Sequence, residues 1–567
     1  MYVKLQDILK FIDRFSGSNS SPQTTKLSVG VFMSILHQST ESVSFQSFIH
    51  EVRMIVPEED IRFDRHTNTE LERNTLAVDK KVMGIIFPRT VEQIQVIVKA
   101  ANKYKVALYP ISQGKNIGYG ELTPYSNDQV ILNLCHLKNI RDYDSVAGEI
   151  VVEPGVTQAD LAQFLKQIDA PFWADVTGAT PEASILGNTL EGGFGHTPMG
   201  DHRKHVVNVE AILADGRLIQ AGEMPALGPD LTALFIQSNL AVITAIKISL
   251  MPIPAECKTF ILTFATEEQF LKSLPTICKL KNRGIINNLL HFGNATRTLI
   301  TSGFVDQIKE VELIFDEATS LEHFNKNSPI QIGAWSAAGA IYGGPAEVNE
   351  KLKILKSELN AYAKLKTFSD RQVNLINTVL NLNCLQGFKL IKNIRNSFQV
   401  LNTVHGLLRG QPSHKPTENL IGRNGSIKNL GLAWFAPVVP AREKELTKLL
   451  QIARNVFTKH GFLMPLTLTL VNSGKLIAVF NIKFDKLKID EVEGAHQAYA
   501  ELSSQCYKEG FFPYRAGLLT KLSGAIPKGK AHLMALIKKS IDPQNIIAPG
   551  RYQFNEPNIN LKFKAEL

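Results

Sequence analysis

Ser112-Gln113-Gly114-Lys115-Asn116-Ile117-Gly118-Tyr119-Gly120 follows directly on the apolar run 106–111 and carries three glycines within seven residues. An apolar run beside a glycine-rich turn predicts a buried strand that opens into a loop. Glycine adopts positive φ at little cost, so such a loop can point several backbone N–H groups into one concavity. A concavity of this kind binds phosphate, although an ordinary tight turn would also explain the glycines.

Two common phosphate-binding motifs do not fit this loop. A Walker loop would place Ser or Thr after its lysine, whereas Lys115 is followed by Asn116. A dinucleotide-binding G-x-G-x-x-G would need a third glycine, but Gly118-Tyr119-Gly120 is followed by Glu121-Leu122-Thr123. The ligand of the loop therefore has to be identified from other motifs.

The size and composition of the chain are those of a multidomain globular protein. It has 567 residues, of which 44% are hydrophobic and 20% charged. Its apolar runs stop well short of the roughly 18 residues of a membrane span, and the N-terminus lacks the apolar core of a secretory signal. The five cysteines are far apart, without a C-x-x-C, which predicts free thiols and a cytoplasmic location.

The net charge of +9 does not by itself indicate nucleic-acid binding. Lysines and arginines are spread along the chain, and no basic block is interleaved with aromatic residues. The densest basic stretch, 521–539, alternates with apolar residues and is expected to be the solvated face of a helix. A mild positive excess is also suited to an anionic cofactor or substrate.

Helices and strands are predicted to alternate on both sides of the glycine loop. Thr90 and Gln93 form the pattern of a capping box that opens a helix over 91–104. Further strands are expected at 130–134, 150–153, 206–213, 217–221 and 242–250, with a helix over 157–168 and a hairpin turn at Asp215-Gly216. This alternation indicates an α/β layer.

The character of the chain changes after Pro254. Alternating apolar residues on both sides of Asn472-Ser473-Gly474 predict an antiparallel hairpin, and a helix over 443–460 ends at Gly461. We expect a separate α+β domain with a large antiparallel sheet here. Residues 1–42, rich in Ser, Thr and Gln, are expected to form a poorly packed leader.

A second glycine-rich segment lies at 186–202, some 75 residues after the first. Two such segments suggest a long ligand that lies across backbone, as a dinucleotide does. The cluster His196, Asp201, His202 and His205 would also suit a metal, but its spacing is not H-E-x-x-H, so no metal site is predicted. A serine hydrolase is disfavoured because no G-x-S-x-G occurs.

Five segments together carry a family resemblance: 111–120, 153–157, 186–202, 237–244 and 541–551. In this order and spacing the chain resembles the vanillyl-alcohol oxidase and p-cresol methylhydroxylase family of FAD-linked oxidoreductases, from about Phe45 onward. The resemblance implies an α+β fold, in which a two-subdomain, PCMH-type FAD-binding domain carries a ferredoxin-like antiparallel cap domain. It implies an FAD domain over 43–252, a cap over 253–505 and a return to the FAD domain over 506–567.

The resemblance also implies which residues hold FAD. The first glycine loop would bind the pyrophosphate, and the second segment would line the rest of the flavin. The implied cofactor-binding residues are Ser112, Gln113, Gly114, Lys115, Asn116, Ile117, Ser184, Gly187, Asn188, Gly193, Gly195, His196 and Ile243. For the glycines of the second segment, a tight sheet corner is the alternative interpretation.

At the substrate end, Tyr119, Tyr514 and Arg515 match positions that hold a phenol as its phenolate in phenol-oxidising members. The resemblance implies hydride transfer from a benzylic carbon to flavin N5, driven by electron donation from the phenolate. A positive charge and two hydroxyl donors favour the anion and lower the pKa of the substrate. The alternative is that the three residues only pack and pair where the domains meet.

Two departures from the family pattern affect the chemistry. The run from Asp175 to Ser184 lacks the second Asp that phenol oxidases place near flavin N5, and Glu182 is the one nearby carboxylate that could replace it. The position of the flavin-linking histidine matches Leu432, which cannot form that bond. We therefore expect non-covalent FAD.

The expected substrate is a small aromatic, and the electrons would pass to oxygen or to an electron-accepting protein. The oligomeric state is left open, with a homodimer among the options. The missing Asp motivates an alternative, in which a catalytically altered flavin-fold protein serves a biosynthetic or binding role.

Overall fold

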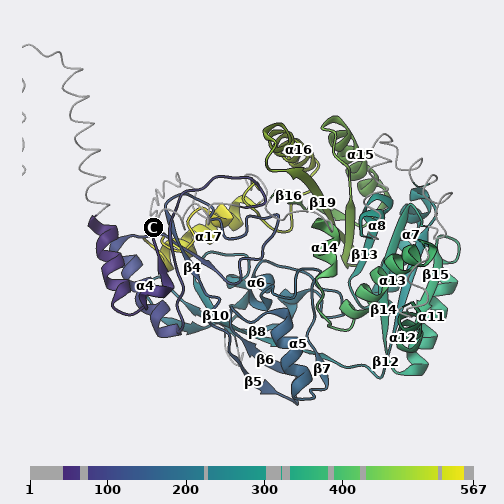
Figure 1. Ribbon diagram of the computed structural model, residues 1–567, viewed down its shortest axis with the longest axis horizontal. Coiled ribbons are helices and arrows are strands. Elements are labelled where there is room, and N and C mark those ends of the chain that lie inside the picture. The colour runs from purple at the N-terminus through teal and green to yellow at the C-terminus, as the bar shows by residue number, and fades with distance from the viewer. Residues whose placement is uncertain are drawn as a thin grey trace, which may run out of the picture.

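The computed structural model describes residues 43–63, 74–222, 228–301, 321, 332–380, 389–421, 429–521 and 526–553. The expected leader 1–42 lies outside these residues. Figure 1 shows an N-terminal α/β part, coloured purple and blue, beside a green part built on a large sheet. No helix in the described ranges combines the length and the apolar character that a bilayer crossing requires.

The first sheet carries the glycine loop at the end of its edge strand. Its order is β1-β2-β4-β3, with β2, β3 and β4 parallel. The elements are η1 Glu58–Asp60, β1 Ile61–Arg62, β2 Val82–Ile86, α4 Val91–Tyr104, β3 Leu108–Ile111 and β4 Gln129–Asn133. Helix α4 has the predicted bounds, and Thr90 Oγ1 accepts from Gln93 N. The capping box is only half formed, because the Gln93 side chain accepts from Arg89 N instead of Thr90 N.

The second sheet has the order β5-β6-β10-β8-β9, and its neighbouring strands are antiparallel. The predicted turn at Asp215-Gly216 joins β8 to β9, and Gly216 has φ 82°. The elements of this part are β5 Ile140–Asp144, β6 Glu149–Val152, α5 Gln158–Gln167, β7 Phe172–Trp173, α6 Ile185–Leu190, η2 His202–His205, β8 Val206–Ile212, β9 Leu218–Gln220, η3 Thr232–Phe235, β10 Val242–Ser249 and β11 Met251–Pro252.

The C-terminal helix and the residues after it pack on the α/β part (Figure 1). Helix α17 Lys528–Ile541 leads into a stretch that extends the first sheet, where Leu108 bridges Ile547. The expected solvated face is present, since Lys528, Lys530 and Lys539 are exposed, but Lys538 departs from it, because it is only 1% exposed. Its Nζ donates to Asp542 Oδ2 at 2.5 Å and to the Asn239 and Ile547 carbonyls, so the lysine ties this helix to the loop that follows it.

The third sheet is an eight-stranded antiparallel sheet with the order β15-β12-β14-β13-β18-β19-β16, and β17 pairs with β19. Its strands are β12 Glu256–Phe264, β13 Leu290–Asn294, β14 Trp335–Gly343, β15 Lys364–Phe368, β16 Leu430–Phe435, β17 Val438–Pro440, β18 Leu466–Asn472 and β19 Lys475–Asp485. The accompanying helices are α7 Glu267–Asn282, α8 Ala295–Thr301, α11 Pro345–Leu359, α12 Asp370–Leu380, α13 Lys389–Leu407, α14 Lys415–Ile421, α15 Glu443–Lys459 and α16 Ile489–Lys508. The predicted hairpin at 472–474 is the β18–β19 connection.

The side chains of each strand alternate between the two faces of this sheet. In β12, Phe260, Leu262 and Phe264 point into the main apolar core, which also holds buried residues of α7, α11, α15 and α16. The alternate residues, Ile261 and Thr263, line a cavity on the opposite face. Because side chains alternate along a strand, helices that cover one face leave the other face free to roof a site.

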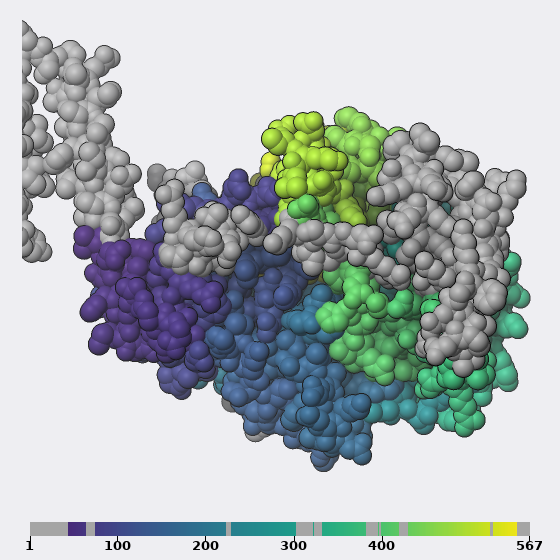
Figure 2. All heavy atoms as spheres, viewed as in Figure 1, coloured from purple at the N-terminus to yellow at the C-terminus, as the bar shows by residue number. Residues whose placement is uncertain are grey.

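The sheet with its helices, which we call the cap, touches the α/β part directly (Figure 2). Pro437 bridges Pro513, Leu432 N donates to Thr75 O, and Glu182 pairs with His414. A cavity lies between these two parts.

Candidate functional site

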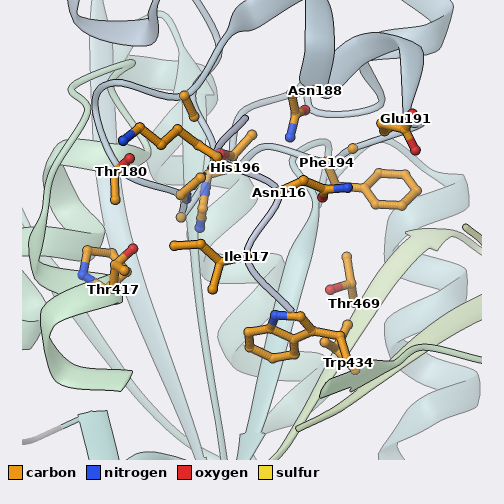
Figure 3. Close-up of a pocket in the computed structure, with 18 of the residues that line it drawn as sticks. Asn116, Ile117, Thr180, Asn188, Glu191, Phe194, His196, Thr417, Trp434 and Thr469 are labelled. Carbon is orange, nitrogen blue, oxygen red and sulfur yellow. Dashed lines mark hydrogen bonds between the residues drawn. The ribbon is translucent and has the colours of Figure 1, made fainter. Parts of the chain in front are cut away.

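A cavity of about 920 Å³ lies between the glycine-rich segments and the cap sheet. Its walls come from the glycine loop, from α6 and the residues after it, from the cap strands and from the C-terminal segment. Figure 3 shows Asn116, Ile117 and His196 from the α/β part facing Trp434 and Thr469 from the cap. A cavity of this size holds a cofactor-sized ligand.

The glycine loop has the conformation that its sequence predicts. Gly114 and Gly118 have φ values of 63° and 76°, which L side chains rarely adopt. A Cβ on Gly118 would lie 2.0 Å from Trp434 Cδ1, so the loop lies directly against a cap side chain. Gly118 N donates to Thr75 Oγ1 at 2.9 Å, which fixes the far end of the loop.

The backbone N–H groups of this loop are available to bind a phosphate. Residues 113–117 all line the cavity. Across the described part of the chain, no oxygen accepts a hydrogen bond from their five backbone N–H groups. These residues are half-buried, apart from the exposed Lys115, so their N–H groups are available to an anionic group supplied by a ligand.

The second glycine-rich segment meets the first at the start of α6. Ser184 caps this helix, since its Oγ accepts from Gly187 N at 2.9 Å. A Cβ on Gly187 would lie 2.3 Å from Ser112 Oγ, so glycine is what allows the two segments to touch. Gly193 leaves room in the same way for the Asn188 side chain.

A cationic and aromatic cluster closes one end of the cavity. The Arg515 guanidinium lies 4.2 Å from the centre of the Tyr119 ring, and its Nη2 donates to Asn116 Oδ1 at 2.8 Å. Tyr514 lies beside both residues and packs on Phe194 with ring centroids 5.2 Å apart. Arg515 Nε is buried and has no acceptor among the described residues, so it can donate to a ligand.

The ionisation of this cluster favours a bound anion. Burial raises the pKa of Tyr119 well above its ordinary value, and Tyr514 adds to the rise while Arg515 opposes it. Burial acts to lower the pKa of Arg515, but Tyr514, Tyr119 and Glu191 outweigh it and the pKa is raised. The arginine therefore stays charged, while Tyr119 stays a neutral donor.

Glu191 holds several charged groups together behind this cluster. Its Oε1 accepts from Arg551 Nη2 and from the Tyr552 hydroxyl, and its Oε2 lies 3.7 Å from Arg515 Nη2. Both Glu191 and Arg551 line the cavity. The sequence motifs contained these two residues but gave no reason to pair them, because 360 positions separate them.

The cap roofs the cavity with two rows of residues that run across its strands. The first row is Lys366, Ile261, Ala338, His291 and Thr469. The second row, two residues away along each shared strand, is Thr263, Ser336, Gly293, Thr467 and Val479. All ten residues line the cavity, as the period of two along a strand requires.

A pair of histidines joins the cap to the second glycine-rich segment. The rings of His196 and His291 lie 4.7 Å apart, and His291 Nε2 lies 3.1 Å from the Gly195 carbonyl. Burial lowers the pKa of both rings, that of His291 to about 3. Both are neutral at ordinary pH. Sequence reasoning did not single out His291, because no motif surrounds it.

Asp175 holds the second glycine-rich segment in place through hydrogen bonds to its backbone. Its carboxylate accepts from Thr197 N at 2.7 Å, and His202 Nε2 lies 2.6 Å from Oδ2. Burial acts to raise the pKa of Asp175, but His202 and Thr197 outweigh it and the pKa is lowered. A Cβ on Gly195 would lie 1.3 Å from this carboxylate, so glycine is required there.

The structure brings most of the predicted site residues to one cavity. Those that line it are Ser112, Gln113, Gly114, Lys115, Asn116, Ile117, Tyr119, Ser184, Gly187, Asn188, Gly193, His196, Ile243, Tyr514 and Arg515. Gly195 lies just behind the wall, against Asp175. Glu182 is not brought to the cavity, because its half-exposed carboxylate faces His414. Leu432 is buried on β16 against Ile117 and Trp434. In the described ranges, no three His, Cys, Asp or Glu side chains gather as a metal site.

Comparison with known proteins identifies the cofactor. Residues 82–222, which include both glycine-rich segments, match the FAD binding domain family. The 4-cresol dehydrogenase (hydroxylating) flavoprotein subunit of Pseudomonas putida is 26% identical over 478 residues, which cover 82% of this chain and 86% of that protein. The 1'-carboxy-chondrochloren decarboxylase of Chondromyces crocatus is 24% identical over 522 residues, covering 87% and 94%. The cofactor is FAD, as predicted.

Solved structures confirm the predicted fold class. The structure of p-cresol methylhydroxylase with substrate bound superposes with a TM-score of 0.76 at 24% identity, covering 90% of this chain and 96% of that one. The 4-ethylphenol oxidase of Gulosibacter chungangensis gives the same TM-score at 23% identity, with 90% and 97% covered. An FAD-binding domain with an antiparallel cap is therefore the architecture of the chain.

Proposed function

Because this chain is an FAD-binding flavoprotein of the oxidoreductase kind, we propose that it oxidises a para-substituted phenol by loss of hydride from the benzylic carbon. The observation that carries the proposal is the cluster of Arg515, Tyr119 and Tyr514, which shares one cavity with the loop that carries unpaired N–H groups. The names of two similar proteins, a 4-cresol dehydrogenase and a 4-ethylphenol oxidase, support the same substrate class.

The cluster would hold the substrate as its phenolate. The buried Nε of Arg515 has no acceptor among the described residues, and a phenolate oxygen supplies one. Charge-assisted hydrogen bonds favour the anion over the neutral phenol. The ionised oxygen donates electrons through the ring to the para carbon, which weakens the benzylic C–H bond.

FAD would lie with its pyrophosphate on the backbone of residues 113–117 and with its remaining length along the second segment. When bound, it supplies the acceptor for the hydride. The neutral pair His196 and His291 and the threonines of the cap sheet would enclose the benzylic end of the substrate. Electrons would then pass to oxygen or to an electron-accepting protein, and a homodimer remains part of the proposal.

We expect the flavin to be bound without a covalent link. Leu432 occupies the position matched to the linking histidine, and no cysteine is among the described residues that line the cavity. Acid precipitation should therefore leave the yellow colour in the supernatant, with the absorbance spectrum of free FAD. Colour that stays with the pellet after washing would contradict this expectation.

Anaerobic reduction of the flavin tests the proposed reaction. We expect 4-ethylphenol and 4-hydroxybenzyl alcohol to bleach the flavin band near about 450 nm, whereas 4-ethylanisole, which cannot form a phenolate, should leave it unchanged. Bleaching by hydroxy acids or sugars but not by phenols would refute the assignment of Arg515, Tyr119 and Tyr514.

Glu182 pairs with His414 and does not line the cavity, which favours a second candidate function. In this candidate the site binds its ligand without oxidising it. No described carboxylate lines the cavity apart from Glu121 and Glu191, so the missing Asp has no evident replacement. This candidate predicts that phenols shift the flavin spectrum but never bleach it.

A further inference from the structure

Arg297 is a charged residue of the cavity that the proposed phenol oxidation does not use. It lies on α8, directly after the cap strand β13, and it lines the roof of the cavity. Its Nε donates to Thr467 Oγ1 at 3.2 Å, and Thr467 belongs to the second row of the cap sheet. This bond fixes the guanidinium, and neither of its two terminal nitrogens has a hydrogen-bond acceptor among the described residues.

The charge of Arg297 is not balanced by the described part of the protein. The described side chains that line the cavity include five lysines and arginines but two carboxylates, Glu121 and Glu191. Both carboxylates have other partners: Glu121 accepts from Gly118 and Thr75, and Glu191 from Arg551 and Tyr552.

The surroundings of Arg297 are also unlike those of the other buried arginines. Arg515 and Arg551 share Glu191, and Arg409 pairs with Asp370 at 2.6 Å. Burial lowers the pKa of Arg297 to about 10, and no neighbouring anion in the described residues offsets it. Arg297 is half-buried and lines the cavity, so an anion that binds there would supply the partner that its charge lacks among the described residues.

The anion is best supplied by the substrate. The pyrophosphate has its own donors in the glycine loop, which contacts β16 of the cap sheet, whereas Arg297 lies against β13 and β18. Arg297 instead lies next to the substrate-enclosing groups, since a Cβ on Gly293, two residues after His291 on β13, would lie 3.3 Å from Arg297 Cγ. The exposed Lys366, in the row of His291, gives an approaching anion a second positive charge near the cap.

We infer that Arg297, held by Thr467, forms a carboxylate subsite, and that the substrate is a para-substituted phenol whose side chain carries a carboxylate. The substrate class rests on the proposed function, but the subsite itself does not. A guanidinium presents two parallel N–H donors, and their geometry matches that of a carboxylate.

Ligand binding without turnover tests the subsite. The holoenzyme is titrated with 3-phenylpropionate and with its neutral analogue 3-phenylpropan-1-ol, and binding is followed by the change in flavin absorbance. A charge-assisted hydrogen bond contributes about 1.5–3 kcal/mol, roughly a tenfold to hundredfold change in Kd. We expect wild type to bind the acid more tightly by this factor, and Arg297→Gln to lose the preference while its affinity for the alcohol stays unchanged.

Two control variants and a measurement of the flavin reduction potential make the result decisive. Arg297→Lys should keep part of the preference, and Lys366→Gln should lower it by a smaller factor than Arg297→Gln does. An equal loss of both ligands in Arg297→Gln would overturn the subsite and indicate a structural role. A shifted flavin reduction potential in ligand-free Arg297→Gln, with the acid preference intact, would overturn it in favour of a contact with the flavin.

The phenol assignment is tested separately with 3-(4-hydroxyphenyl)propionate. Reduction of the wild-type flavin by this compound at a lower KM than by 4-propylphenol would support both the subsite and the proposed function. If neither phenol reduces the flavin but Arg297 still selects 3-phenylpropionate, the proposed function fails and the subsite stands.

Discussion

Arg515→Gln is expected to lower the rate constant of flavin reduction by 4-ethylphenol roughly 10²–10³-fold, the loss seen when one donor to a developing anion is removed. The guanidinium lies 4.2 Å from the Tyr119 ring centre and keeps an unpaired Nε. Glutamine leaves the phenol oxygen without a cationic partner, so the substrate binds as the neutral phenol. Stopped-flow absorbance under anaerobic conditions measures the rate constant.

The pH dependence of this variant separates a catalytic role from a packing role. With Arg515 present, a bound phenol ionises below its solution pKa of about 10, the value of an unperturbed phenolic group. In Arg515→Gln, the rate should rise with pH toward that value, and phenols made more acidic by ring fluorination should recover part of the loss. A uniform loss at every pH, or a fall in FAD content, would instead indicate that Arg515 only holds the domains together.

Arg515→Lys provides an intermediate control. Lysine keeps the positive charge but lacks the planar fork and the stacking surface of arginine on Tyr119. We expect a smaller loss of rate than in Arg515→Gln, with little change in the pH profile. A lysine variant as slow as the glutamine variant would show that geometry matters more than charge.

Gly118→Ala is expected to weaken FAD binding at least tenfold, the second large effect. Left-handed φ costs an L-residue roughly 1–2 kcal/mol, and Gly118 has φ 76°. The added Cβ would also lie 2.0 Å from the Trp434 ring, an overpacking that costs roughly 1–3 kcal/mol more. The strain moves the loop and turns its N–H groups away from the pyrophosphate. Equilibrium dialysis against FAD measures the loss.

Gly284 offers a matched control on the same chain. Its φ is 68°, but a Cβ there would meet nothing within 4 Å. Gly284→Ala should therefore lower the stability of the fold only through the left-handed φ, and it should leave the affinity for FAD unchanged. Adding Trp434→Leu to Gly118→Ala should restore part of the affinity, since the smaller side chain makes room. Equal FAD affinities in the two glycine variants would contradict the proposed clash.

Local elements of the fold could be predicted from the sequence because their signals are local. Helix α4 begins after Thr90 and ends at Tyr104 as expected, and the β18–β19 hairpin turns where the asparagine and glycine are. The two glycine-rich segments could be predicted because positive φ and close backbone approach require glycine, and glycine can be recognised directly in the sequence. Lys538 was wrongly expected in solvent, because its partners come from other segments.

The cap half of the site could not be predicted in the same way. His291 and Arg297 stand in no motif, and their place in the cavity follows from the pairing of β13 with β14 and β18. Glu182, the one nearby carboxylate that could replace the missing Asp, faces His414. Strand register and domain contact depend on packing over long sequence distances, and short sequence windows carry little information about them.

The sequence by itself located the two backbone segments that line the cavity, and its resemblance to a known family implied the FAD-binding architecture. The segments could be located because positive φ and close approach admit few residues other than glycine. Only the tertiary structure decided which side chains share the cavity: it joined Glu191 to Arg551, set Arg515 on Tyr119, and left Arg297 without a carboxylate among the described residues. Charge balance in a cavity is a property of side chains that meet from distant segments, so it exists only once the chain has folded.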